Sequence, residues 1–159
     1  MRLATLRLLA SSLVITMLFA LSQWVWGHVA TTTPVITAAE VLAFQNNASG
    51  QDKYVIVDVR SQAETDVSMI PGALTQSEFE KSAHLHQGKQ IIVYCTIGVR
   101  SGNYAASLNQ QGWNASNYKG SILDWCAHDL PLVANGSGTN KVHTYNEWYS
   151  APAHYVGVH

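Results

Sequence analysis

Two short apolar runs constrain the fold of this chain more than any other feature. Residues 54–58 and 91–94 are apolar almost throughout, rather than alternating between apolar and polar side chains. Continuous runs of this length are typical of strands buried on both faces, at the centre of a parallel sheet. Helix-like stretches at 38–45, 76–83, 101–111 and 121–128 alternate with these runs and with shorter strands at 35–36, 73–75 and 117–119. The alternation predicts an α/β fold with a parallel sheet.

The second apolar run leads directly into Cys95, and the residues after it indicate a reactive cysteine. A tight loop leads into the helix that the sequence predicts from Ser101, a residue type that often caps a helix. The unpaired N–H groups of a helix N-terminus favour an anion, and therefore a thiolate over a thiol. Gly98 lets the loop turn sharply, and Arg100 adds a permanent cation. A lone cysteine at a strand end is more often a small buried apolar residue, but the Gly, Arg and Ser at these offsets favour a nucleophile.

Four separated segments resemble the motifs of rhodanese-like sulfurtransferases, in the order that the family has them. They are residues 55–60 (VIVDVR), 70–73 (IPGA), 95–101 (CTIGVRS), and 120–125 (GSILDW) with LPL behind it at 130–132. The resemblance covers roughly residues 34–133. It implies a rhodanese-like parallel five-stranded sheet with helices on both faces, in a domain of residues 31–134. It also implies a thiosulfate sulfurtransferase-like enzyme, for which we expect no cofactor.

The resemblance implies a role for each residue of the loop. Cys95 is expected to be catalytic and to take up sulfane sulfur as a persulfide. The expected partners are a small sulfur donor and a thiol or cyanide-type acceptor. Phosphatases built on this fold have a longer loop than the four residues between Cys95 and Arg100, because a phosphoryl group needs a wider cradle than one sulfur atom. The residues expected to bind the substrate are Thr96, Ile97, Gly98, Val99, Arg100 and Ser101.

The chain departs from the family pattern at Ser68-Met69, where the family commonly has Gly-His and we expect variation of the scaffold, and at two further positions. Thr96 is neutral where members that use thiosulfate often have a basic residue, which removes a contact for that anion. Ser121 stands where the family commonly has a second glycine. We expect the change at Thr96 to affect the choice of donor and the change at Ser121 to be variation of the scaffold.

Asp58 and Arg60 follow the first apolar run, at the end of the predicted strand. Ligands of parallel α/β sheets bind at the carboxyl ends of the strands, so this loop and the Cys95 loop are expected to face one pocket. Arg60 is expected either to contact the substrate or to form a structural ion pair. Asp58 is expected to be a structural residue near the site.

The N-terminal residues have the layout of an export signal. Arg2 and Arg7 precede an uncharged apolar segment at 8–21, and no Asp, Glu, Lys or Arg occurs between Arg7 and Glu40. This is the order of a secretory signal, and an apolar segment at 8–29 is long enough to anchor the chain in a membrane. Residues 1–30 are therefore predicted to be a signal peptide or a membrane anchor. Either one predicts an exported domain, periplasmic or membrane-anchored, outside the cytoplasm.

Charge and residue spacing argue against several other classes of protein. The net charge is −1, charged residues make up 12% of the chain, and no run of Lys or Arg occurs, so we expect no nucleic-acid partner. His84 and His86 are two residues apart, as are Cys126 and His128, and neither spacing matches a zinc site. No metal site is predicted.

Residues 135–159 lie beyond the usual family domain and form an aromatic C-terminal extension. They are expected either to pack as an arm over the domain or to bind a partner or gate the substrate. An alternative function is a non-enzymatic module for partner binding or redox sensing in the cell envelope. Redox sensing would use a bond between Cys95 and Cys126, whereas a persulfide carrier would keep both thiols free. The rings of the extension are Tyr145, Trp148, Tyr149 and Tyr155.

Overall fold

The computed structural model describes residues 32–47 and 52–159, and Thr33–His159 forms one compact unit. The predicted export segment, residues 1–30, lies outside the described residues and stays a prediction. Within the described part of the chain, no helix is both long enough and apolar enough to cross a membrane.

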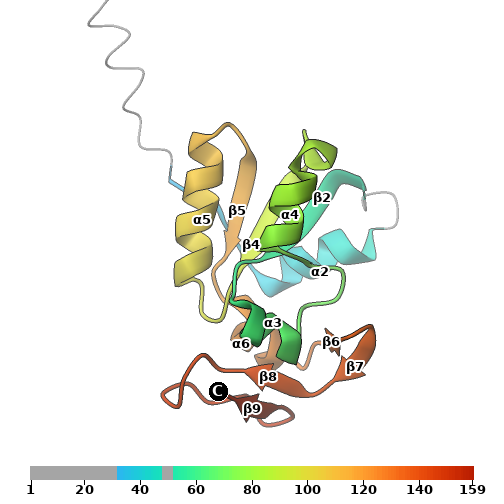
Figure 1. Ribbon diagram of the computed structural model, residues 1–159, viewed down its shortest axis with the longest axis vertical. Coiled ribbons are helices and arrows are strands. Elements are labelled where there is room, and N and C mark those ends of the chain that lie inside the picture. Colours follow the sequence, from blue (N-terminus) through green and yellow to red (C-terminus); the bar gives the residue numbers. More distant parts are fainter. Residues whose placement is uncertain (1–31, 48–51) are drawn as a thin grey trace, which may run out of the picture. The chain divides into compact units, whose positions relative to one another are not determined.

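Five strands form one parallel sheet in the order β1-β5-β4-β2-β3 (Figure 1). The two apolar runs of the sequence become the neighbouring strands β2 and β4, which pair Val55 with Ile91 and Val57 with Val93. The family resemblance therefore predicted the sheet correctly, with its five strands and parallel pairing. The strands are β1 (Val35–Ile36), β2 (Tyr54–Asp58), β3 (Leu74–Thr75), β4 (Gln90–Tyr94) and β5 (Asn114–Tyr118).

Side chains of the central strands alternate between two apolar cores, one on each face of the sheet. Ile56 and Ile92 face the core that includes α2 (Ala38–Asn46) and α6 (Ser121–Ala127). Val57 and Val93 face the core that includes α4 (Gln76–Ser82) and α5 (Val99–Gln110). Cys95 belongs to this second core, so its side chain lies on the α5 side of the sheet.

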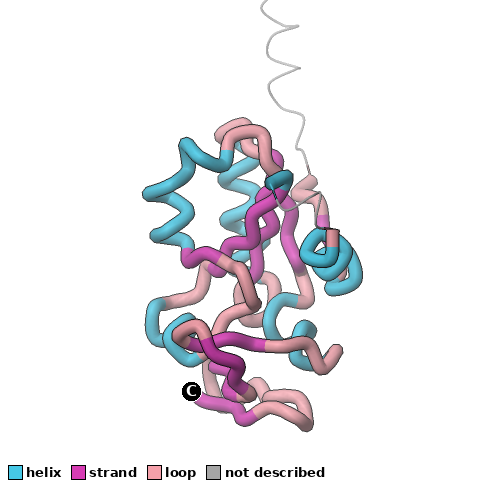
Figure 2. Tube along the Cα trace, turned by 90° about the vertical axis from the view of Figure 1, so that its right-hand side faces the viewer, coloured by secondary structure: helices cyan, strands magenta, loops and turns pink. Residues whose placement is uncertain are grey.

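Helices lie on both sides of the strands (Figure 2). Thr37 and Thr75 begin two of them, and each hydroxyl accepts from the amide of a glutamate three residues later, whose carboxylate binds the threonine amide in return. These capping boxes satisfy amides that a helix N-terminus leaves without partners. The helices are α2 (Ala38–Asn46), α3 (Gln62–Val67), α4 (Gln76–Ser82), the 3₁₀ helix η2 (Ala83–His86), α5 (Val99–Gln110) and α6 (Ser121–Ala127).

The helix behind Cys95 begins earlier than the sequence predicts. Its N-cap is Gly98, and α5 starts at Val99. The prediction of Ser101 as the N-cap is therefore wrong. Ser101 lies in the first turn and is fully buried, and its hydroxyl donates to Oδ1 of Asn117 at 2.7 Å. Its partner comes from β5, which local helix signals do not reveal.

The last strand of the sheet, β5, also begins before the predicted position. It starts at Asn114 instead of residue 117, in a stretch whose polar side chains do not resemble a buried strand. Gln90 of the neighbouring strand satisfies these groups: its amide donates to Ser116 Oγ at 2.7 Å and accepts from Asn114 Nδ2 at 2.8 Å. Cross-strand hydrogen bonds therefore replace apolar packing at this end of the sheet.

The C-terminal residues pack against the domain. β6 pairs antiparallel with β7, and β8 pairs parallel with β9. Met69 and Val133 exchange backbone hydrogen bonds of 2.8 and 3.0 Å. Val142 of β8 is buried in the same core as Trp125, and β8 lies beside α3 (Figure 1). The strands are β6 (Leu132–Ala134), β7 (Ser137–Thr139), β8 (Lys141–His143) and β9 (Val156–Val158).

Candidate active site

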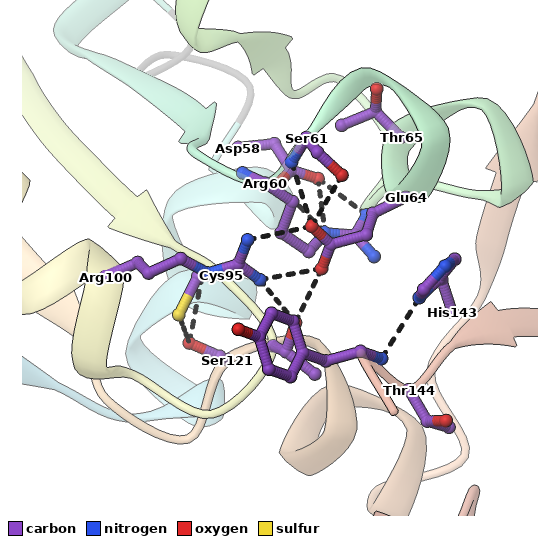
Figure 3. A network of polar contacts seen from close by, with 12 residues as sticks. Asp58, Arg60, Ser61, Glu64, Thr65, Cys95, Arg100, Ser121, His143 and Thr144 are labelled. Atoms are coloured by element: carbon purple, nitrogen blue, oxygen red, sulfur yellow. Dashed lines mark hydrogen bonds and ion pairs between the residues drawn. The ribbon is translucent and has the colours of Figure 1, made fainter. Parts of the chain in front are cut away.

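Cys95 follows β4 directly, and its sulfur faces the first turn of α5. The Sγ atom accepts a hydrogen bond from the Gly98 amide at 3.1 Å, and the Ser101 hydroxyl lies 3.5 Å away. The Cys95 amide donates to Oγ of Ser121 at 3.1 Å, and Figure 3 shows this hydroxyl beside the sulfur. Ser121 directs its own proton to the Tyr118 carbonyl at 2.9 Å. Hydrogen bonds from the loop and the helix therefore fix the sulfur.

The Ser101 hydroxyl has a single proton and two acceptors within reach. Asn117 Oδ1 is 2.7 Å from Oγ, and Cys95 Sγ is 3.5 Å from it. Asn117 Nδ2 donates to the Gly98 carbonyl at 3.0 Å, which turns the amide oxygen toward Ser101. A neutral thiol leaves the proton on the shorter bond to Asn117. A thiolate attracts it to the sulfur, because hydrogen bonds to charged groups are stronger.

Two opposing effects set the pKa of the Cys95 thiol. Burial raises this pKa, because the thiolate loses its water. Hydrogen bonds from the Ser101 hydroxyl and from the amides of Ser101, Ile97 and Gly98 lower it, and the result is a pKa of about 7 against an ordinary 9.0. About half of the protein therefore carries a Cys95 thiolate at neutral pH.

Gly98 shapes the loop in a way that no other residue can. Its φ is 92°, in the left-handed region, and a Cβ built on it would lie 2.0 Å from the carbonyl oxygen of Lys119. Both the backbone conformation and the close approach of the chain before α6 require glycine here.

Arg100 forms a paired hydrogen bond with Glu64 from the first turn of α3 (Figure 3). The distances are 2.8 Å from Nη1 to Oε2 and 2.6 Å from Nη2 to Oε1. The Thr96 hydroxyl donates to Glu64 Oε1 at 3.0 Å and accepts from Arg100 Nη2 at 2.9 Å. Burial raises the pKa of Glu64, but hydrogen bonds from Arg100 and Ser61 lower it to about 2. The carboxylate is therefore charged at neutral pH and neutralises the loop cation.

A cavity of about 240 Å³ adjoins Cys95. The ring of Tyr145 covers the Arg100 guanidinium, with the Cζ atom 5.1 Å from the ring centroid. The cavity therefore combines the loop with aromatic side chains from the C-terminal extension. Besides Cys95, it is lined by Thr96, Ile97, Val99, Arg100, Tyr145 and Tyr149.

A sequence model of the Rhodanese-like domain matches residues 38–128, which is more than half of the 159-residue chain. The chain belongs to this family. A relative from Allochromatium vinosum, named sulfurtransferase, is 34% identical over 84 residues, which cover 50% of this chain and 78% of that protein.

Two solved structures resemble this rhodanese-like domain in their fold. A rhodanese-like domain protein from Staphylococcus aureus has a TM-score of 0.51 at 25% identity, over 58% of this chain and 91% of that one. Thiosulfate sulfurtransferase from Pseudomonas aeruginosa has a TM-score of 0.55 at 23% identity and covers 66% of this chain. The match spans 21% of that longer protein, so the likeness establishes the fold alone.

The loop after β2 of the rhodanese-like domain lies beside the Cys95 loop but holds a separate ion pair. The Val59 amide donates to the Tyr94 carbonyl at 3.1 Å. Arg60 binds Asp58 through Nε at 3.0 Å and Nη2 at 2.7 Å, and it binds the Ser68 carbonyl at 2.5 Å. Both charged side chains are fully buried, and Arg60 is absent from the lining of the Cys95 cavity. This position favours the structural role over the predicted contact with substrate.

Several residues around the sulfur escaped the sequence analysis. Glu64 is the most important of them, because it determines the charge of the loop. The pattern Ser61-x-x-Glu64 is a helix-start signal, and the Glu64 carboxylate does accept the Ser61 amide at 2.9 Å. Nothing in that pattern indicates that the same carboxylate also binds Arg100. The other residues are Asn117, Ser121, Tyr145 and Tyr149; Ser121 was noted only as variation of the scaffold, and the two tyrosines only as parts of the extension.

The second cysteine lies on the other face of the sheet. Cys126 is buried among residues of the α2 and α6 side, whereas Cys95 belongs to the α4 and α5 side, and both thiols are free. Burial raises the pKa of Cys126 to about 12, so it remains a thiol at neutral pH. Within residues 32–47 and 52–159, His, Cys, Asp and Glu side chains form no cluster of three or more that could hold a metal ion.

Proposed function

We propose that this rhodanese-like domain is a sulfurtransferase that carries sulfane sulfur as a persulfide on Cys95. The observation that carries the proposal is the setting of the Cys95 sulfur. It accepts the Gly98 amide at the carboxyl end of a parallel strand, and its pKa of about 7 provides a thiolate at neutral pH. The name of the Allochromatium vinosum relative, sulfurtransferase, supports the same activity.

The reaction needs a nucleophile and stabilisation of negative charge. The Cys95 thiolate attacks the outer sulfur of a donor R–S–S⁻, a new S–S bond forms, and R–S⁻ leaves with the electron pair of the broken bond. A thiol or cyanide-type acceptor then attacks the outer sulfur of the Cys95 persulfide and restores the thiolate. No net proton transfer is required when the reacting thiols are ionised, so the step needs no general base.

In this proposal the loop from Thr96 to Ser101 binds the transferred sulfur. The first amides of α5 have no partners within the helix, and the helix N-terminus carries partial positive charge. The outer sulfur of the persulfide would occupy the space in front of these amides, where Gly98 already donates to Sγ. The cavity of about 240 Å³ that Cys95 lines would provide the room for an added atom.

Redox sensing through a bond between the two cysteines receives little support from their positions. A disulfide requires Cα atoms within about 7 Å and side chains that point toward each other. Cys95 and Cys126 point into different cores, separated by the sheet. The proposal therefore gives Cys126 a packing role.

We also propose that the domain works outside the cytoplasm. Arg2 and Arg7 before the apolar segment at 8–21 support export. Reporters fused after His159, one active only inside the cytoplasm and one only outside, test this location. Activity of the cytoplasmic reporter alone would contradict export.

Mass spectrometry of the intact protein tests the proposed function directly. After treatment with a sulfane donor, the protein should gain about 32 Da, the mass of one sulfur atom. Cys95→Ser should abolish both the gain in mass and sulfur transfer to cyanide. Cys126→Ser, which changes the other buried cysteine, is the matched control and should retain both.

Circular dichroism of each variant separates loss of chemistry from loss of folding. A folded Cys95→Ser variant that still forms thiocyanate would refute the assignment. If folded Cys126→Ser lost sulfur transfer and Cys95→Ser kept it, the sulfur carrier would be Cys126 instead of Cys95.

A further inference from the structure

The charge of the cavity beside Cys95 differs from what the loop sequence indicates. Among the described residues that line it, Arg100 is the one charged residue besides the ionisable Cys95. Both terminal nitrogens of Arg100 bind the Glu64 carboxylate, whose side chain is only 4% exposed. The pair has no net charge, and the Thr96 hydroxyl donates its proton to the same carboxylate. Once Cys95 is a thiolate, the formal charge of the Cys95, Arg100 and Glu64 side chains together is negative.

Such a site disfavours a donor with two negative charges. Like charges at close range in a partly buried site repel strongly, because water screens them poorly there. Thiosulfate brings two charges and no organic group. A donor with a single charge meets less repulsion and reaches the sulfur more easily.

The walls of the cavity are apolar and aromatic. Ile97 and Val99 come from the loop, and Tyr145 and Tyr149 come from the segment between β8 and β9. The aliphatic side chains and the faces of the two rings offer apolar contact to an organic group. Burial of apolar surface against them stabilises a bound donor by about 25 cal/mol for each Å² removed from water.

The aromatic wall is held in place by the extension. The Tyr145 amide donates to His143 Nδ1 at 3.0 Å, and the Thr144 amide donates to the Val158 carbonyl at 2.8 Å. The φ of Tyr145 is 75°, an unfavourable value for a large side chain that persists only where the surroundings enforce it. The turn therefore presents the ring to Arg100 at a cost in backbone energy.

We propose that the sulfur donor of this site is a singly charged organic sulfane, such as an organic persulfide, and that Glu64, Tyr145 and Tyr149 determine this choice over thiosulfate. The inference rests on the proposed function and adds the class of donor. In the transfer, the Cys95 thiolate takes the sulfane sulfur and the organic thiolate leaves, while its R group stays against the tyrosines. Sulfur and charge balance, since two anions react and two anions form.

Three stable donors separate the effect of charge from that of the organic group. Thiosulfate has two charges, methanethiosulfonate has one charge and a methyl group, and benzenethiosulfonate has one charge and a ring. With each thiosulfonate, Cys95–S⁻ and R–SO₂–S⁻ give Cys95–S–S⁻ and R–SO₂⁻. Cyanide is the common acceptor, and thiocyanate formation gives kcat/KM for each donor.

We expect kcat/KM for benzenethiosulfonate to exceed that for thiosulfate by at least about tenfold, the factor that corresponds to 1.4 kcal/mol. Methanethiosulfonate should lie between them. Changing Tyr145 and Tyr149 together to alanine should remove most of the preference for the ring over the methyl group, and changing both to phenylalanine should retain it. Glu64→Gln should raise the thiosulfate value relative to methanethiosulfonate severalfold, because it releases the charge of Arg100.

Trp148→Ala is the matched control, since this aromatic residue of the same segment is 84% exposed and does not line the cavity. It should leave all three ratios unchanged. Equal or better use of thiosulfate by the wild type would overturn the inference and leave the proposed function standing. Absence of Cys95-dependent transfer from all three donors would overturn the proposed function itself. Tyrosine-to-alanine variants that keep the preference for the ring would overturn the role of the extension.

Discussion

Removing the Ser101 hydroxyl should raise the pKa of the Cys95 thiol. This hydroxyl is the largest of the contributions that lower the pKa to about 7, against burial, which raises it. A hydrogen bond to a charged group contributes about 1.5 kcal/mol at the lower end of its range, which equals about one pKa unit. In Ser101→Ala the thiolate fraction at pH 7 should therefore fall from about one half to about one tenth, and the alkylation rate about fivefold.

The assay is the rate of alkylation by iodoacetamide between pH 5 and pH 10, a range chosen to include the expected values on both sides of neutrality. Cys126 should contribute little, because burial raises its pKa to about 12. Ser107→Ala, which removes an exposed hydroxyl from the same helix, is the control and should leave the profile unchanged. An unchanged pKa of Cys95 in folded Ser101→Ala would mean that, in the wild type, the Ser101 hydroxyl keeps donating to Asn117 Oδ1, 2.7 Å away, even when Cys95 is ionised.

Three further outcomes are expected. Gly98→Ala should lower the free energy of unfolding, measured by urea denaturation, by more than about 3 kcal/mol. The reasons are backbone strain and the overlap of the new Cβ with the Lys119 carbonyl oxygen at 2.0 Å. Gly88→Ala, which is also at positive φ but in open space, is the control and should lower it by only about 1–2 kcal/mol. The folded pKa of Glu64, about 2, lies below its ordinary 4.5, so the stabilisation it contributes is complete above about pH 4.5 and lost as the pH falls toward 2. Wild type should therefore lose more stability than Glu64→Gln across that window, and parallel curves for the two proteins would contradict the ion pair. Thiol titration of air-exposed protein after unfolding should find both cysteines free. A loss of both free thiols that a reductant reverses would support the redox-sensing alternative.

Local sequence patterns determined two central strands of the sheet and the position of Cys95 at the end of one of them. Continuous apolar runs indicate strands covered on both faces, and they became β2 and β4 at the centre of the sheet. Cys95 at a strand end, with Gly98 three residues later, defines a tight turn whose geometry depends on neighbours in the chain. Such features are predictable because all the interacting groups lie within a few residues of one another.

Only the tertiary structure decided the charge and the walls of the site. In the sequence Arg100 looks like a free cation, but in the folded domain Glu64 from α3 and Tyr145 from the extension contact it. Ser101 is similar, because it looks like a helix cap until β5 supplies Asn117 as its partner. The lowered pKa of the Cys95 thiol thus comes from nearby residues of the loop and of the first turn of α5, whereas the net charge around it depends on groups from distant segments. No local sequence pattern predicts these contacts, since they depend on the order of the strands in the sheet and on the path of the segments that connect them.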